Sequence, residues 1–394
     1  MRISEPGMSA FVTIALVFVL MATAIHLLSI ALAALRCRRS RTQAPPQEIS
    51  VPITLVRTIR DIDALEEQTL RSTFNLSYPA FEVLFCAASE SHPAVASVRR
   101  LMAAYPHVRA RLLIGDDRVS ANPKLNNMVK GWREAQHDWI VFADSNLMLP
   151  PDYLQRALSV WTTDTGAVCA PPIGSQPSGL WSDVEAAFLN TYQARWQYAA
   201  DSIGLAFAQG KTMLFRREQL ESLGGMAALS TELAEDAAVT KIVRNGGFRV
   251  RLAGPSFFQP LGRRPAAHVL ARQLRWAQLR RLTFPGWFAL EPLTGSAVPL
   301  IAAAMAAPAL DIPAELAVAG LAMLWFGAEA ALARIGGWHL SWRSPFSWFL
   351  RDLLIPMIWL RAWTADTYEW RGNRVARQQD GSISMTTESA VGLH

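Results

Sequence analysis

An uncharged apolar segment near the start of the chain restricts the fold more than any other feature. From Ser9 to Leu35 the sequence contains no Asp, Glu, Lys or Arg. As a helix rising about 1.5 Å per residue, this segment can cross a hydrocarbon core of about 30 Å. Arginines follow it closely, whereas only Arg2 and Glu5 precede it. The positive-inside rule predicts an N-terminal anchor with the residues after Arg36 in the cytosol, and the length of the run disfavours a cleaved signal peptide.

A second apolar zone lies in the last third of the chain. Leu293–Leu310 carries no charge and Ala314–Ala333 carries only two glutamates. The short joint between them predicts two antiparallel spans that return the chain to the cytosol. Basic residues flank a third apolar segment, Phe346–Trp363, on both sides, which favours a re-entrant or interfacial helix. Together these segments predict a multi-pass protein of the inner (cytoplasmic) membrane, ending in a polar tail that is disordered after Gln378.

The composition excludes several classes of protein. Hydrophobic residues make up 51% of the chain and charged residues 18%, against about 25% in an average soluble domain. A fully soluble enzyme and a disordered chain are therefore disfavoured. The three cysteines are too few and too scattered for a disulfide framework or a zinc cluster. The formal net charge of +6 fits an anionic membrane surface, a phosphate ligand or a nucleic acid. The hydrophobicity favours the first two, so no nucleic-acid partner is expected.

Strand-like and helix-like segments alternate between residues 45 and 264, which predicts an α/β domain with a doubly wound, mostly parallel sheet. Ligands bind such sheets beyond the carboxyl ends of the strands. The sequence has neither GxxxxGK[ST] nor GxGxxG, so ATPase and dinucleotide-binding functions are disfavoured. The predicted organisation is an anchor (1–42), a cytosolic catalytic domain (43–264), an amphipathic interfacial segment (265–292), membrane or re-entrant helices (293–364) and a polar tail (365–394).

Asp144 directly follows the predicted strand Trp139–Ala143 and precedes Ser145 and Asn146. A carboxylate at the end of a buried strand can hold a divalent cation that bridges a nucleotide diphosphate. The same residue could instead only cap the next turn.

Two further segments carry groups that suit phosphate or proton chemistry. Glu235 and Asp236 lie in the predicted helix Glu232–Asn245, where they could be solvated or could supply a general base. Lys124 follows a predicted strand through a polar segment and is one of four lysines. It could contact phosphates or be an ordinary surface lysine.

Arg272 and Arg275 are three residues apart and therefore share one face of a helix. Two guanidinium groups on one face suit a diphosphate, although attraction to lipid headgroups would explain them equally well. Trp276 follows directly, and the aromatic residues near Trp287 suit a helix on a bilayer surface.

Taken together, these motifs resemble the inverting, lipid-directed glycosyltransferases of the GT-A fold, and most closely the ceramide glucosyltransferases. The resemblance extends over nearly the whole polar block and includes the order of the membrane segments. It is carried by Tyr78–Cys86, Tyr105–Gly115, Asn122–Asn127, Asp144-Ser145, Pro151-Asp152, Ala234–Asp236 and Arg272–Trp276.

The resemblance implies a role for each matching residue. Asp236 would be the general base, and Asp144 would hold Mg²⁺ or Mn²⁺ on the diphosphate of a UDP-sugar. Arg272, Arg275 and Trp276 would close on the donor. The donor pocket would also include Lys124, Asn126 and Asn146, and the acceptor or sugar pocket Gly210, Lys211 and Glu235.

Two positions depart from the family pattern. Ser89 stands where the first acidic motif of the family should have an aspartate, with Glu90 beside it, and both are candidate donor-binding residues. Either Glu90 substitutes for the aspartate, or the affinity for the donor is weaker, or the donor differs. Lys211 stands where the family has an apolar residue, and a cation there could select a different sugar.

The predicted activity is transfer of glucose from UDP-glucose to the primary hydroxyl of ceramide, with a β-glycoside as product. A hopanoid or diacylglycerol acceptor, or an amino- or uronic-sugar donor, is the alternative within the enzyme class. A catalytically inactive scaffold that binds UDP or lipid is the alternative outside it.

Overall fold

The protein is described from a computed structural model that covers residues 6–42, 50–59, 65–115, 117–120, 122–255, 257–364, 367–370, 373–377 and 383–387. The chain divides into two compact units. The helical unit comprises Met1–Arg38, Gly179–Ala199 and Arg264–Thr364. The sheet unit comprises Arg39–Ser178, Ala200–Arg263 and Ala365–His394.

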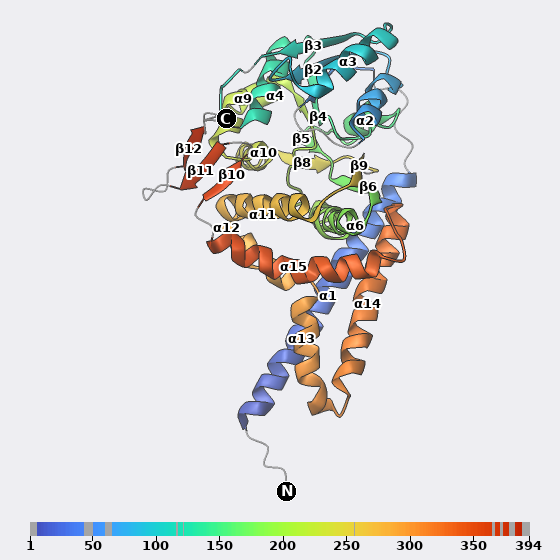
Figure 1. Ribbon diagram of the computed structural model, residues 1–394, viewed down its shortest axis with the longest axis vertical. Helices are drawn as coiled ribbons and strands as arrows, with labels where there is room; N and C mark the ends of the chain where they lie inside the picture. The colour runs from blue at the N-terminus through green and yellow to red at the C-terminus, as the bar shows by residue number, and fades with distance from the viewer. Residues whose placement is uncertain are drawn as a thin grey trace, which may run out of the picture. The chain divides into compact units, whose positions relative to one another are not determined.

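The centre of the sheet unit is a seven-stranded sheet in the order β3-β2-β1-β4-β7-β5-β8 (Figure 1). All neighbouring strands pair in parallel except β7, which is antiparallel to both β4 and β5. The predicted α/β class with a mostly parallel sheet is therefore confirmed. The strands are β1 (Ile53–Thr58), β2 (Phe81–Ala87), β3 (Ala110–Ile114), β4 (Trp139–Asp144), β5 (Thr165–Cys169), β7 (Thr212–Arg216) and β8 (Arg249–Leu252).

Helices cover both faces of this sheet, because alternate residues of each buried strand point to opposite sides. Leu55 of β1 packs in one apolar cluster with Leu70 and Val98, whereas Val56 faces Gly131 on the other side. The helices of the unit are α2 (Glu66–Ser72), α3 (Pro93–Ala104), α4 (Pro123–Glu134), α5 (Tyr153–Leu158), α8 (Arg217–Ser222), α9 (Gly225–Ala228) and α10 (Glu235–Asn245), with 3-10 turns η1 (Thr73–Asn75) and η3 (Leu229–Thr231).

The remaining strands of the sheet unit form two small sheets. β6 (Pro172–Ser178) and β9 (Phe257–Arg263) pair in parallel, and β10 (Thr367–Trp370), β11 (Asn373–Arg377) and β12 (Ile383–Thr387) form an antiparallel sheet. The tail after Gln378 that was predicted to be disordered lies outside the described residues, except for the strand β12.

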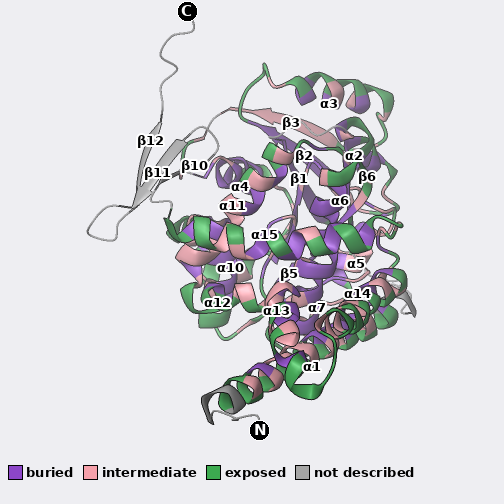
Figure 2. Cartoon of the chain, turned by 60° about the horizontal axis from the view of Figure 1, so that its bottom comes forward, coloured by how far each residue is buried: buried purple, intermediate pink, exposed green. Residues whose placement is uncertain are grey.

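The helical unit contains two helices that are long and apolar enough to cross a membrane, within the part of the chain that the structure describes. They lie at Ala10–Arg39 and Ala314–Gly336, and only 11% and 22% of their most apolar windows are buried. In Figure 2 much of α1 (Pro6–Thr42) and α14 (Ala314–Gly336) has the colours of exposed and intermediate residues. Large apolar side chains such as Ile14, Leu20 and Met323 are exposed there, as expected for helices whose solvent is lipid.

The predicted span at Leu293–Leu310 is not one long helix. It consists of η4 (Glu291–Thr294), α13 (Ala297–Ala306) and η5 (Ala307–Leu310), and the apolar stretch Ala297–Leu310 is too short to rank with the two candidate spans. The prolines at 299 and 308 lack the N–H that a continuing helix needs beyond its first turn.

α15 (Ser344–Thr364) runs crosswise to α13 and α14 within the helical unit (Figure 1). It packs against α6 (Leu180–Ala187) and α11 (Ala266–Thr283). It is not one of the two candidate spans among the described helices, and its expected re-entrant or interfacial position stays a prediction. The other elements of the unit are the π-helical segment η2 (Phe188–Ala194), α12 (Pro285–Ala289) and the part of α7 (Arg195–Ser202) up to Ala199.

Candidate active site

Asp144 is the last residue of β4 and lies beside Thr58, the last residue of the parallel strand β1. The loop after it is anchored by Arg57, which is fully buried. The Arg57 guanidinium donates to the carbonyl oxygens of Ser145 and Leu147 at 3.0 and 3.1 Å. Asp144 is thereby fixed at the carboxyl edge of the sheet, where ligands bind in folds of this type.

Two ammonium groups lie on the two carboxylate oxygens of Asp144. Lys124 Nζ is 2.9 Å from Oδ1, and Lys211 Nζ is 2.7 Å from Oδ2. Burial by itself raises the pKa of Asp144, but Lys124 and Lys211 outweigh it and lower the pKa to about 2. Burial by itself lowers the pKa of Lys124, but Asp144 and Glu235 outweigh it and raise that pKa above its usual value. Asp144 and Lys124 are therefore both charged at neutral pH.

The two lysines reach Asp144 from elements that the sequence reasoning did not identify. Asn122 caps α4, because its side chain accepts from the backbone N–H groups of Lys124 and Leu125, and Pro123 occupies the first helical position. An Asn-Pro pair is a known helix-start signal and could have placed Lys124 in a first helical turn. Lys211 arrives because β7 is antiparallel to β4, so that the start of β7 lies at the end of β4.

Glu235 and Asp236 open α10, and both face this cluster. Glu235 Oε1 is 2.8 Å from Lys124 Nζ, and its Oε2 accepts from Asn122 at 2.7 Å. Asp236 Oδ2 accepts from the backbone N–H of Gly210 at 3.0 Å. Burial and the neighbouring Glu235 raise the pKa of Asp236 to about 6, against opposition from Lys124. A carboxylate with such a pKa can accept a proton near neutral pH.

Gly210 permits this close arrangement because it has no side chain. A Cβ at this position would lie 2.7 Å from Glu235 Oε1 and 2.9 Å from Lys124 Nζ. Its carbonyl oxygen also accepts from Lys124 Nζ. A larger residue would separate the lysine from the acids of α10.

The structure thus brings together seven of the predicted residues, all in the sheet unit. They are Lys124, Asp144, Asn146, Gly210, Lys211, Glu235 and Asp236. The placement of Lys124 excludes the alternative of a solvated surface lysine, since it is only 7% exposed.

Three other predicted donor residues make different contacts. Glu90 is exposed and pairs with Arg99 at 2.7 Å, and Ser89 shares a hydrogen bond with Ser91. Asn126 is buried, and its side-chain oxygen accepts from the backbone N–H groups of Val119 and Ser120. In these contacts Asn126 shapes the loop before α4.

Arg272, Arg275 and Trp276 lie on α11 in the helical unit. Arg272 is buried and its Nη1 is 2.5 Å from Oε1 of Glu185 on α6, whose other oxygen is 3.0 Å from Arg264 Nε. The Arg272 guanidinium also lies over the Trp276 ring, 5.9 Å from its centroid. Sequence reasoning missed Glu185, because an acidic residue in a short helix gives no sign of its distant partner.

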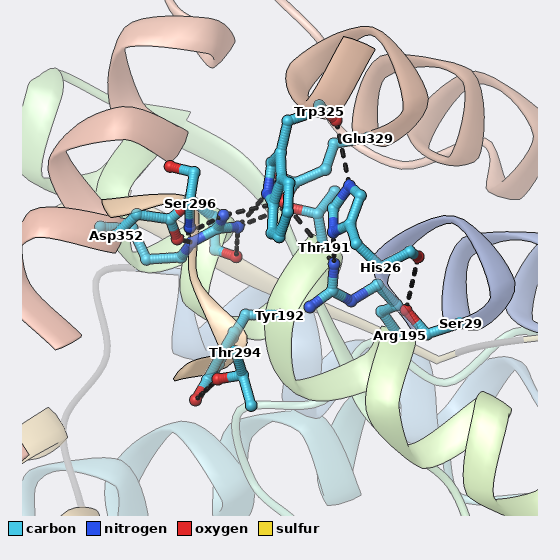
Figure 3. Close-up of polar contacts among 12 residues, drawn as sticks. His26, Ser29, Thr191, Tyr192, Arg195, Thr294, Ser296, Trp325, Glu329 and Asp352 are labelled. Atoms are coloured by element: carbon cyan, nitrogen blue, oxygen red, sulfur yellow. Dashed lines mark hydrogen bonds and ion pairs between the residues drawn. The ribbon is translucent and has the colours of Figure 1, made fainter. Parts of the chain in front are cut away.

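A second set of buried charges lies among the helices of the helical unit (Figure 3). Arg351 on α15 makes bonds of 2.8 and 3.1 Å to the two oxygens of Glu329 on α14, and one of 2.8 Å to Asp352. Arg195 donates to Nδ1 of His26 on α1 at 2.6 Å. The other ring nitrogen of His26 lies 3.1 Å from the Trp325 carbonyl, which only accepts, so His26 is neutral with its proton on Nε2.

Comparison with solved structures shows the fold family. The chain resembles the mannosyltransferase PcManGT from Pyrobaculum calidifontis, solved in complex with GDP-Man and Mn²⁺, with a TM-score of 0.51 and 19% identity. The likeness covers 86% of this chain and 98% of that one, and it shows the GT-A glycosyltransferase fold.

The chain belongs to glycosyl transferase family 21, whose family model matches residues 21–383. Ceramide glucosyltransferase 1 of Caenorhabditis elegans is 26% identical over 344 residues, which cover 86% of this chain and 74% of the relative. The ceramide glucosyltransferase of Komagataella phaffii is 28% identical over 318 residues, covering 65% and 62%. The resemblance to ceramide glucosyltransferases is confirmed, and the protein is a membrane-associated glycosyltransferase.

Proposed function

We propose that the protein transfers glucose from UDP-glucose to the primary hydroxyl of ceramide, with inversion at the anomeric carbon. The relatives named above are ceramide glucosyltransferases, which supports both substrates. The observation that carries the proposal is the joining of Asp144 and Asp236 in one cluster at the carboxyl edge of the sheet, through Lys124 and Gly210.

Asp236 is the general base in this mechanism. One of its carboxylate oxygens accepts the hydroxyl proton as the acceptor oxygen attacks the anomeric carbon, while the bond to the diphosphate breaks on the opposite side. The backbone N–H groups of Gly210 and Ala237, 3.0 and 2.8 Å from the carboxylate, hold it in position. One carboxylate is sufficient, because the leaving diphosphate needs neutralisation of its charge and not protonation.

The donor is held by the predicted donor-binding groups. Lys124 and Asn146 belong to the Asp144 cluster, and Arg272, Arg275 and Trp276 close on the diphosphate and the sugar ring. Glu185 positions the Arg272 guanidinium through their buried ion pair. The lipid acceptor enters from the inner leaflet of the cytoplasmic membrane, with the sheet unit in the cytosol.

A divalent cation is the expected partner of Asp144, and the neighbouring mannosyltransferase was solved with Mn²⁺. The side chains around Asp144 do not suit a divalent cation as a ligand set. Both oxygens of Asp144 contact ammonium groups, and the described residues contain no group of three or more His, Cys, Asp or Glu side chains that could hold a metal. In the proposed mechanism, cationic side chains of the protein therefore neutralise the charge of the diphosphate.

Product formation tests the proposed function. Membranes containing the protein should convert ceramide and labelled UDP-glucose into a β-glucosylceramide, and parallel reactions with UDP-glucuronic acid and with diacylglycerol test the alternatives. Lys211 is the reason for including an acidic sugar, because an ammonium group at the site could pair with its carboxylate. The absence of any labelled lipid product would favour the inactive scaffold and contradict the proposal.

The pH dependence of transfer provides a prediction of its own. A general base acts only when deprotonated, and burial with Glu235 raises the pKa of Asp236 to about 6. We expect kcat to be constant above pH 7 and to fall as the pH drops through about 6, approaching a tenfold loss for each further pH unit. Initial rates at saturating substrates between pH 5 and 8 measure this profile. A rate independent of pH across this interval would contradict the assignment of the base.

A further inference from the structure

The Lys211 ammonium occupies the position on Asp144 at which a strand-end carboxylate would bind a cation. It lies 2.7 Å from Oδ2, and it donates to Asn146 Oδ1 at 3.0 Å. A divalent ion on Asp144 would need the same oxygen and would be repelled by the charge of the lysine.

The two lysines of the cluster differ in their remaining donor capacity. An ammonium group has three N–H bonds. Lys124 Nζ directs them to Asp144, Glu235 and the carbonyl of Gly210, so its capacity is used. The described contacts of Lys211 Nζ are those with Asp144 and Asn146, which leave one N–H for another acceptor. Its side chain is 14% exposed, whereas that of Lys124 is 8% exposed.

The net charge at the end of β4 also suits an ammonium group in the place of a divalent ion. Two ammonium groups on one carboxylate carry a net charge of one positive unit, which equals that of a divalent ion on one carboxylate. Glu235 balances part of this charge through Lys124, so Lys211 is the ammonium group that can act on a bound anion. A charge-assisted hydrogen bond from lysine to a phosphate oxygen is among the stronger hydrogen bonds in proteins.

We propose that Lys211 replaces the divalent cation in this enzyme, and that its ammonium group binds the donor diphosphate and neutralises the leaving UDP. This inference rests on the proposed function and concerns the same site. It predicts that neither UDP binding nor sugar transfer requires a divalent metal.

The test is calorimetric titration of the full-length protein in lipid nanodiscs with UDP, in EDTA and in MnCl₂. We expect the affinity of the wild-type protein for UDP to differ less than about threefold between the two conditions. Lys211→Met should weaken UDP binding in EDTA about tenfold or more, since it removes a charge-assisted bond. Mn²⁺ should restore part of this loss, because Asp144 Oδ2 is then accessible to the ion.

Two further variants serve as controls. Lys211→Arg keeps the cation and should bind UDP in EDTA much better than Lys211→Met. Lys241→Met removes a lysine that pairs with Glu232 at 2.5 Å, outside the cluster, and should bind UDP as the wild type does. Thermal unfolding of each variant verifies that it is folded.

Each contrary result has a distinct meaning. A tenfold or greater loss of wild-type UDP affinity in EDTA, restored by Mn²⁺, would overturn the role of Lys211 and leave the proposed glycosyl transfer intact. Unchanged UDP binding by folded Lys211→Met in EDTA would also overturn that role. A folded wild-type protein that binds no UDP in either condition would overturn both proposals.

Discussion

Replacement of Asp236 by asparagine is expected to lower kcat by about 10² to 10⁴-fold, the usual contribution of a positioned general base. The amide has nearly the shape of the carboxylate, but it cannot accept the proton of the acceptor hydroxyl. Donor binding should remain, since the cluster of Asp144, Lys124 and Lys211 is unchanged. Turnover with ceramide and UDP-glucose, and UDP affinity measured separately, distinguish loss of the base from loss of the donor site.

A matched control is available in the same unit. Asp164 directly precedes β5 and pairs with Arg251 at 2.8 Å, and it has no described contact with the Asp144 cluster. Asp164→Asn should therefore leave kcat within about twofold of the wild type, as is usual for surface substitutions. An Asp236→Asn enzyme with turnover close to that of Asp164→Asn would show that Asp236 is not the base.

Replacement of Glu329 by glutamine should destabilise the helical unit by about 3–5 kcal/mol, the usual cost of removing one partner of a buried ion pair. Arg195 and Arg351 face Glu329 and Asp352, so two positive charges balance two negative ones. All four side chains are at most 1% exposed. After the substitution, the two guanidinium groups would share one carboxylate. Unfolding of the full-length protein in mixed detergent micelles measures the change in free energy.

Two companion variants sharpen this test. Glu315→Gln changes an exposed glutamate on the same helix and should shift the free energy of unfolding by less than about 0.5 kcal/mol. The double variant Glu329→Gln/Arg351→Met removes one charge of each sign and should be less destabilised than Glu329→Gln alone. If Glu329→Gln unfolds like Glu315→Gln, the buried network does not stabilise the unit.

These charges also connect the N-terminal helix with the rest of the helical unit. His26 stacks on Trp325 with ring centroids 3.8 Å apart and accepts from Arg195 (Figure 3). The contacts link α1, α7 and α14, which are far apart in the sequence. A polar network with all its main charges paired can specify one packing arrangement among apolar helices that otherwise fit in several ways.

Much of the sheet was predictable from local patterns. Short, mostly apolar runs such as Phe81–Cys86 and Trp139–Ala143 are buried strands, because burial on both faces favours apolar residues at most positions. β7 was missed, since Thr212–Arg216 is a short run of five residues that begins with a threonine and ends with an exposed arginine. That strand is antiparallel, and the direction of a strand depends on the connection before it and not on its own residues.

The sequence by itself determined the apolar anchor, the α/β class and the candidate residues Asp144, Asp236 and Lys124, because hydropathy, periodicity and short motifs are local properties of a chain. It also revealed the departure at position 211. Only the tertiary structure decided what Lys211 and Glu185 contact, since their partners lie 67 and 87 residues away in the sequence. Ion pairing depends on distances of a few ångströms, and such distances between remote segments exist only once the chain has folded.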